Sequence, residues 1–519
     1  MNNKLFWAVS FLILLLGLFL RLFATKDHHY YFTVDEGNDA VNIREIIERK
    51  QVQFNGPVTE IEGVYTGPLW YYFVGIGYLI TKGDPFGAPL MVILLNLFLT
   101  FVLMVVIKRY VGQVMSLVVG ASMQFFWDFF KTSLYGFNPF PLVALAFFLI
   151  FFLIQFLRGK KKYYLFGSFI IILGFNTEIA GTVAFFLFFA LIGLWGIHKK
   201  IFNLKYYLLC NLLIIFLALT PILHQFGKQF FLHSSLPKPS VGSGNKVFMG
   251  SNFDAIISNF IDLTLSTAFP LNKFFATFFV GIIFLTYITI GYKNSFVSKF
   301  IKLTTILFFV SLAFFASNKG WRDWHTVYLA PLIFVSFILI ISSLPKALKL
   351  SFLTVLIVSN IVYFSASYNY YLNLQNDNGL LSNKLRSLDW IYTHNEGNGF
   401  NAYTYTNTFF DYTYQYLFWW YGKGKYGFVP CEYANYPLSH KELYIPGYLY
   451  YSKPTLGCDK IRFVIIKSDT NGEKNKDWII TFRKYNTLID RTEFNGIKIE
   501  KYYVKEGSPT DLCIWRNVC

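Results

Sequence analysis

An acidic cluster lies close to the amino terminus of this 519-residue chain. Asp35 and Glu36 are adjacent, and Asp39 follows in the same segment, residues 32–40. A positioned carboxylate can accept a proton from an incoming hydroxyl, as a general base does. Asp35, with Glu36 beside it, is the candidate for this role. The two acids are also the pair that would bind a divalent metal, because carboxylate oxygens are its preferred ligands.

The residues after this cluster predict a short amphipathic helix over residues 41–50. Ala40, Ile43 and Ile47 follow one another at i, i+3 and i+7 and therefore share one helix face. We expect this face to lie in the membrane surface. The alternative is that Asp35 or Asp39 merely caps the helix and that Glu36 is solvated, since acids are common at helix starts.

A second polar cluster, residues 317–328, carries Arg322 and His325 three positions apart. An arginine contacts phosphate through its planar fork, and a histidine can donate a further hydrogen bond. This spacing predicts a phosphate contact. The alternative is an interfacial belt, in which Trp321, Trp324 and their cationic neighbours anchor a helix end.

Weaker candidates lie in other polar segments between apolar runs. Glu178 stands at the edge of two adjoining apolar segments, where the bilayer penalises an acid that has no partner or cavity. An ordinary solvated turn explains it equally well. Arg44 and Arg49 can pair with Glu48 or Glu45 on a helix face that solvent covers. The further cavity candidates are Asp128, Tyr135, Asn138 and Glu178.

Long apolar runs must position these residues. The chain is 55% hydrophobic and 14% charged, a composition that is rare in soluble proteins. A hydrocarbon core of about 30 Å needs roughly 20 apolar residues per helix. We predict a mainly α, polytopic membrane protein with about eleven spans. They fall near residues 5–24, 86–107, 112–130, 140–157, 163–176, 178–197, 204–223, 274–292, 300–316, 326–344 and 350–367.

Charge predicts the orientation of these spans. Alternate loops carry basic residues and no acid, which marks them as cytoplasmic and places the amino terminus inside. The apolar stretch 68–81 is short and rich in Tyr, Trp and Gly, and counting it as a span would invert every later loop. We therefore predict an interfacial or re-entrant helix there. The basic residues are Lys4, Lys108, Arg109, Arg158, Lys160, Lys161, Lys162, Lys199, Lys200, Lys205, Lys293, Lys299, Lys302, Lys346 and Lys349.

The domain division follows from these spans. Residues 1–367 form the membrane domain, with a large first outer loop at 25–85, and residues 368–519 form an extracytoplasmic domain. Alternating stretches at 401–408, 461–467 and 495–503 predict strands, hence a small α/β fold. Four cysteines in this tail predict up to two disulfides with three alternative pairings, Cys513 and Cys519 being close in sequence. They are Cys431, Cys458, Cys513 and Cys519.

Several chemistries have no motif in the sequence. It contains no Walker sequence, no glycine-rich dinucleotide loop and no Cys/His spacing for zinc. The net charge of +17 is spread over loops and tail, so we expect membrane lipid and not nucleic acid as a partner. An enzyme of this kind would need a substrate that is already activated.

The order of motifs resembles that of the membrane glycosyltransferases of the C-type fold, over roughly residues 1–345. A first span ends in Arg21, then come Asp35-Glu36-Gly37 and a Gly-Pro-Leu-Trp-Tyr-Tyr segment at 67–72. The Asn138-Pro139 turn and the Arg322-x-x-His325 approach to a late span complete the pattern. The chain is similar to bacterial members akin to the protein O-mannosyltransferases and the lipid A aminoarabinose transferases.

The resemblance implies a function and a donor. It implies transfer of a sugar from a polyprenyl phosphate to an acceptor hydroxyl on the outer face of the inner (plasma) membrane, with Asp35 as base. Arg322 and His325 would then contact the donor phosphate. Relatives of the aminoarabinose type place a lysine where Thr66-Gly67 stands here, so that phosphate contact is missing or supplied by a residue such as Arg44. The acceptor, whether glycan, lipid or protein, stays open.

Two other functions fit the same composition. One is a flippase or transporter for lipid-linked glycans, but polar residues would then be expected at mid-membrane, and here they cluster at the outer rim. The other is a polymerase or ligase that transfers longer oligosaccharides. The mass of the product separates that activity from transfer of a single sugar.

Overall fold

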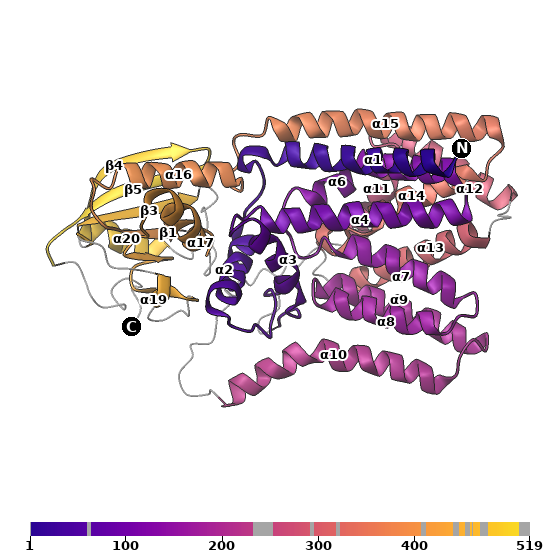
Figure 1. Ribbon diagram of the computed structural model, residues 1–519, viewed down its shortest axis with the longest axis horizontal. Coiled ribbons are helices and arrows are strands. Elements are labelled where there is room, and N and C mark those ends of the chain that lie inside the picture. Colours follow the sequence, from indigo (N-terminus) through magenta and orange to yellow (C-terminus); the bar gives the residue numbers. More distant parts are fainter. Residues whose placement is uncertain are drawn as a thin grey trace.

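The computed structural model describes residues 2–59, 64–231, 253–290, 295–317, 322–405, 412–439, 446–451, 457–458, 460–467 and 476–507. Long helices lie side by side along its long axis, and a small sheet stands at one end (Figure 1). The amino terminus lies at the opposite end of the bundle from the sheet. The chain thus separates into a helical bundle and a mixed α/β part, as the sequence predicts.

Helices occupy every predicted span. Within the described residues, six are long and apolar enough to cross a membrane, or seven if one bent pair counts as a single span, and others are shorter apolar helices. The bundle helices are α1 (Asn3–Ala24), α4 (Gly87–Tyr110), α5 (Gln113–Gln124), α6 (Trp127–Phe130), α7 (Leu142–Phe156), α8 (Lys162–Phe175), α9 (Ile179–His198), α10 (Leu204–Phe231), α11 (Phe253–Ala268), α12 (Lys273–Ile290), α13 (Ser295–Ser317), α14 (Leu329–Ser342) and α15 (Lys346–Leu372). Short 3-10 turns are η1 (Lys26–His28), η2 (Lys131–Ser133) and η3 (Asp323–Thr326).

Two parts of the bundle differ from the prediction. The span expected at 112–130 is broken into α5 and α6, because the backbone leaves the helix at Phe125 and Phe126. Helix α11 has no predicted counterpart, since polar residues such as Asp262 interrupt its apolar pattern. It joins α12 at an 80° bend and packs against α13 and α14.

The ends of the bundle helices that carry basic residues lie together. The Lys108 ammonium at the end of α4 is 4.2 Å from the ring centre of Phe6 near the start of α1. Arg158 lies 4.4 Å from the ring of Tyr110, which stacks on Phe296 at the start of α13. Three of the basic segments thus meet at the end of the bundle remote from the sheet (Figure 1).

The segment 25–85 contains two helices, α2 (Val34–Arg49) and α3 (Leu69–Ile80), between the bundle and the sheet (Figure 1). Helix α2 begins seven residues earlier than predicted. Its apolar face, which includes Ala40 and Ile43, is buried against α3 and the carboxyl-terminal part. The expectation that this face lies in the membrane surface was therefore wrong, because protein covers it.

The carboxyl-terminal part is a five-stranded sheet in the order β2-β1-β3-β5-β4, parallel over the first three strands and antiparallel beyond. Its strands are β1 (Phe400–Tyr405), β2 (Glu432–Ala434), β3 (Ile461–Lys467), β4 (Asn486–Phe494) and β5 (Ile497–Val504). Its helices are α16 (Leu381–Thr393), α17 (Thr413–Leu417), the π-helical turn η4 (Phe418–Gly422), α18 (Lys423–Tyr426), α19 (Tyr448–Tyr451) and α20 (Lys476–Tyr485). Of the predicted strands, all three are present. β2 and β4 were not predicted, because β2 is very short and β4 is an exposed edge strand without alternation.

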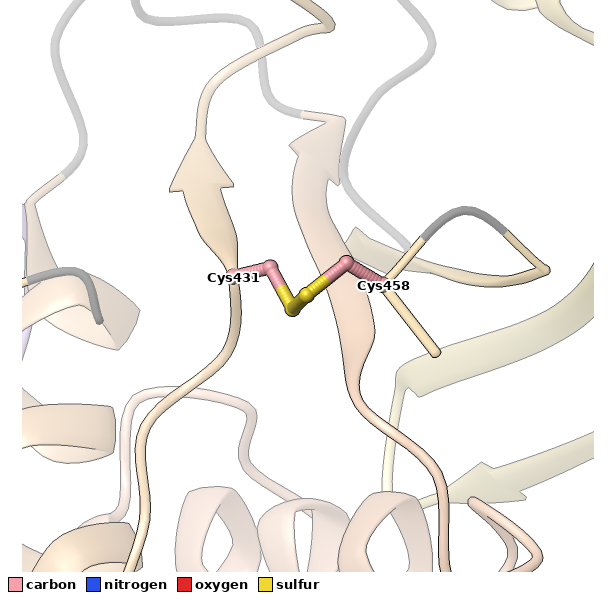
Figure 2. The surroundings of a disulfide bond; sticks show 2 residues. All are labelled: Cys431 and Cys458. Carbon is pink, nitrogen blue, oxygen red and sulfur yellow. A yellow bond between two sulfur atoms is a disulfide. The ribbon is translucent and has the colours of Figure 1, made fainter. Parts of the chain in front are cut away.

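A disulfide joins Cys431 to Cys458, with their Cα atoms 5.9 Å apart. Figure 2 shows the bond beside the sheet, where Cys431 directly precedes β2 and Cys458 lies shortly before β3. This bond excludes the alternatives in which Cys431 or Cys458 pairs with another cysteine, and Cys513 and Cys519 lie outside the described residues. Cys210 is a buried free thiol in α10.

Removing this disulfide should destabilise the sheet. The bond closes a 27-residue separation, for which the loss of unfolded-chain entropy corresponds to about 3–4 kcal/mol. We expect the double variant Cys431→Ser/Cys458→Ser to melt several degrees below wild type in a thermal scan of the purified protein. Cys210→Ser is the matched control, and equal melting of the double variant and this control would contradict the prediction.

Candidate functional site

The acidic cluster is placed by the first turn of α2. Thr33 is the N-cap, and the Glu36 carboxylate accepts hydrogen bonds from the Thr33 amide at 2.8 Å and from its hydroxyl at 2.6 Å. This is a capping box, which the pattern Thr-x-x-Glu encodes. Asp35 and Asp39 are therefore not the cap, and Asp35 lies on the first turn instead of before the helix.

Burial separates the three acids of this cluster. Asp35 is exposed, whereas Glu36 and Asp39 are 3% and 7% exposed. Asp39 accepts a hydrogen bond of 2.8 Å from the Trp70 indole of α3. The alternative in which Glu36 is solvated was thus wrong, and the only carboxylate of the three that water readily reaches is that of Asp35.

The buried acids have perturbed ionisation. Burial raises the pKa of Glu36 from 4.5 to about 7, and the charge of Asp35 adds to the rise, while the bonds from Thr33 oppose it. Burial also raises the pKa of Asp39 well above its ordinary value, the bond from Trp70 opposing and the neighbouring acids reinforcing the shift. Burial therefore disfavours the ionised form of both Glu36 and Asp39.

The carboxyl-terminal part covers the same helix turn. The Thr413 hydroxyl donates to the Thr33 carbonyl at 3.0 Å, and the Tyr412 amide donates to the Asn38 side chain at 3.2 Å. A Cβ at Gly37 would lie 2.5 Å from the Thr413 hydroxyl and 2.6 Å from its Cα. Only glycine permits this approach, so α17 and the acidic turn are held in fixed relation.

Tyr135 connects the acidic cluster with the second polar cluster. Burial raises its pKa above the ordinary value, and the charges of Glu36, Asp35 and Asp323 add to the rise. Two residues further, the Phe137 ring meets Trp324 edge-on at 5.9 Å. The loop after η2 thus lies near both α2 and η3, so that it adjoins two clusters that are nearly 300 positions apart in sequence.

Buried Arg21 at the end of α1 holds this loop. Its Nε donates to the Ser133 hydroxyl at 3.0 Å, and its Nη1 donates to the Gln124 side chain at 2.7 Å. Asn96 of α4 donates to the same Ser133 hydroxyl at 2.8 Å. Sequence reasoning gave Arg21 no structural role, although an arginine inside a span is costly unless it has a task.

The predicted phosphate contacts fall into two environments. Arg322 is partly exposed at the N-cap of η3, with its guanidinium 5.8 Å from the Trp324 ring. His325 is buried, stacks on Phe315, and its Nε2 lies 3.7 Å from a Glu178 oxygen. The Arg322 amide donates to the His325 Nδ1 at 3.3 Å, so the two residues are in contact.

Arg44 lies elsewhere and is fully enclosed. Its Nη2 contacts Glu45 at 3.2 Å and donates to the Pro446 carbonyl at 3.0 Å, and its guanidinium lies 3.8 Å from the ring centre of Tyr451. Arg44 is nine positions after Asp35 in α2, so the two side chains leave opposite faces of the helix. The structure therefore does not bring Arg44 to Asp35.

The remaining candidates have evident local partners. Glu178 caps α9 through the amides of Ala180 and Gly181. Asn138 donates to the Thr177 carbonyl and so fixes the turn before that cap. Asp128 forms an ion pair with Lys131 at 2.6 Å.

The segment that replaces the lysine of similar proteins is closed. Thr66 is buried, and the Gly67 amide donates to the Phe175 carbonyl at 3.0 Å. A Cβ at Gly67 would lie 2.0 Å from the side-chain oxygen of Asn176. Asn176 therefore fills the space that a side chain at this position would need.

A resident metal has no evident cage in this structure. Among the described residues, no group of three or more His, Cys, Asp or Glu side chains could hold a metal ion. One Glu36 oxygen is engaged by Thr33, and Asp39 is engaged by Trp70. Asp35 is the one exposed ligand of the cluster, so a metal would need most of its ligands from elsewhere.

The chain has the fold of a known membrane transferase. It is similar to ArnT from Cupriavidus metallidurans bound to undecaprenyl phosphate, with a TM-score of 0.53, 12% identity, and coverage of 96% of this chain and 97% of that one. The apo structure of that protein gives a TM-score of 0.52 at 12% identity, with coverage of 96% and 98%. No family model and no curated protein matches the chain. The likeness confirms the C-type fold that the order of motifs implied.

The buried acid at position 36 should make stability depend on pH. Its pKa is about 7 when folded and 4.5 for the free group, so the unfolded chain loses this proton first as pH rises. The free energy of unfolding should therefore fall by roughly 3 kcal/mol between those two pH values. In Glu36→Gln this part of the slope should disappear, as measured by denaturant unfolding from pH 4 to pH 8.

Glu48→Gln, an exposed position on the same helix, is the matched control. It should keep the wild-type slope, and other titrating groups cancel in the comparison. Parallel pH profiles for wild type and Glu36→Gln would show that Glu36 does not titrate in this range.

Proposed function

We propose that this chain is a membrane glycosyltransferase that moves a sugar from a polyprenyl-phosphate donor to an acceptor hydroxyl. The observation that carries the proposal is the likeness to ArnT over nearly the whole length of both chains, one ArnT structure being bound to undecaprenyl phosphate. A lipid phosphate is an activated leaving group. This accords with a sequence that has no nucleotide-binding motif.

Asp35 is the proposed base. It is the exposed acid of its cluster, and its neighbours Glu36 and Asp39 are buried with raised pKa values. In the proposed step, the oxygen of the acceptor hydroxyl forms a bond to the anomeric carbon of the donor sugar. Asp35 takes the proton of that hydroxyl. The bond from that carbon to the phosphate oxygen breaks, and the carrier phosphate leaves with the electron pair. Attack opposite the phosphate inverts the anomeric configuration, and a product that retains it would exclude this single displacement.

Arg322 is the proposed donor-phosphate contact, with His325 beside it. The partly exposed guanidinium can offer a planar pair of donors, and Tyr135 lies between this cluster and the acids. We leave Arg44 out of this role, because Glu45, Pro446 and Tyr451 already surround it. Glu178 and Asn138 support the turn against which His325 lies.

The proposal includes about eleven spans in an inner membrane, with the amino terminus in the cytoplasm. It assigns residues 1–367 to the membrane domain and residues 368–519 to an extracytoplasmic domain. Three basic segments meet at the end of the bundle that this proposal places inside. The Cys431–Cys458 bond lies in the part that it places outside, where disulfides persist.

The base assignment predicts the behaviour of Asp35→Asn. The variant should insert and fold like wild type, but transfer should fall at least 100-fold, because the general base is lost. The assay incubates purified protein with a panel of polyprenyl-phosphate sugars and acceptors and follows release of the free carrier. Asp27→Asn, which removes an exposed acid of the same loop, should transfer normally. Wild-type turnover by Asp35→Asn would end the base assignment.

The orientation predicts which side of the membrane labels each loop. In a background with Cys210, Cys513 and Cys519 changed to serine, Asp27→Cys should react with a membrane-impermeant maleimide on intact cells. Lys199→Cys should react only after the membrane is permeabilised. The reverse pattern would overturn the orientation and, with it, the outer-face site.

A further inference from the structure

A polar cavity of about 500 Å³ lies where the last bundle helix meets the sheet. One wall is the segment after α15, and the other is the turn between β4 and β5. We call this cavity the junction groove. Its lining residues are Asn376, Asp377, Asn378, Glu493, Asn495 and Gly496.

Buried polar side chains of α16 fix both walls of the junction groove. Asn383, 2% exposed, donates to the carbonyls of Gln375 and Asp377 at 2.7 and 2.8 Å and accepts from the Asn495 side chain at 2.9 Å. The buried Lys384 ammonium donates to the Asn378 carbonyl. Burying a cation and an amide is costly, so this framework defines a set shape and not a chance depression.

The lining indicates the class of ligand. Its volume is within the roughly 300–1,000 Å³ of small-molecule sites, but such sites are usually apolar and this one is not. Carboxamides both donate and accept, and carboxylates accept, which suits a ligand with several hydroxyl groups. Asp377 and Glu493 disfavour a phosphate or another anion. A lipid chain would find no apolar wall among these six residues.

Tyr31 connects the junction groove with the acidic cluster. It hydrogen-bonds Asp377 in the groove, and its ring meets Tyr135 edge-on at 5.6 Å. Tyr135 in turn lies within the influence of Asp35 and Glu36. A chain of sugar units that occupied the groove could therefore extend along these aromatic rings toward Asp35.

From this placement we infer that the junction groove binds a saccharide, which serves as the acceptor glycan of the proposed transferase. The inference rests on the proposed function for the role of the ligand, but not for its binding. It favours a glycan acceptor over a lipid or a protein side chain.

The first experiment measures binding to the full-length protein on an array of neutral oligosaccharides. The variant Asn378→Ala/Glu493→Ala removes one side chain from each wall. Binding should weaken at least tenfold, whereas Asp490→Ala, an exposed acid of the same strand outside the groove, should bind like wild type. No saccharide binding by wild type, or equal binding by the double variant, would overturn the inference. The inference would also be overturned if the junction groove bound added calcium and no saccharide.

The second experiment separates this inference from the proposed function. In the carrier-release assay, the double variant should raise KM for the bound saccharide at least tenfold with kcat little changed. If wild type binds saccharide through the junction groove but releases no carrier, the binding inference is supported and the proposed transferase activity is contradicted. Carrier release by wild type, together with an unchanged KM in the double variant, would support the transferase and contradict the role of the junction groove.

Discussion

The close packing of α2 against α17 at Gly37 governs the geometry of the candidate site. A backbone-to-backbone approach leaves no room for a side chain, so the first turn of α2 and the sheet part cannot shift independently. The capping box at Thr33 and Glu36 and the Thr413 bond act on the same turn. The position of this turn determines which acids of the cluster are buried and which is exposed.

The fixed position of this turn gives the three acids different exposure to water, and their tendency to ionise differs accordingly. The helix period places Glu36 and Asp39 toward α3 and Asp35 toward water. The two enclosed acids resist ionisation, and one of them is also hydrogen-bonded to Trp70. Burial alone therefore makes Asp35 the carboxylate of the cluster that water reaches most readily.

Hydropathy was sufficient to predict the helical bundle, because the bilayer restricts the backbone of a spanning segment strongly. The Thr-x-x-Glu pattern at Thr33 and Glu36 also encodes the start of α2. The apolar spacing alone predicts a later start, at residue 41. Tertiary packing decided the rest. The face with Ala40 and Ile43 reads as a membrane-surface face until the sheet part is seen to cover it, and Arg44 reads as a solvated cation until Tyr451 is seen beside it. The proximity of Tyr135 to both polar clusters depends on a loop held by Arg21, and no local pattern reveals such long-range contacts.

The contact between Gly67 and Asn176 has a consequence for which substitutions the chain can accept at positions 66 and 67. A lysine introduced at position 67 would collide with the amide of Asn176, and one at position 66 would enter a buried site. Neither substitution is accessible alone, because space must first be opened on the neighbouring helix turn. The residues at positions 67 and 176 are therefore sterically coupled, and a larger side chain at position 67 requires a smaller or displaced one at position 176.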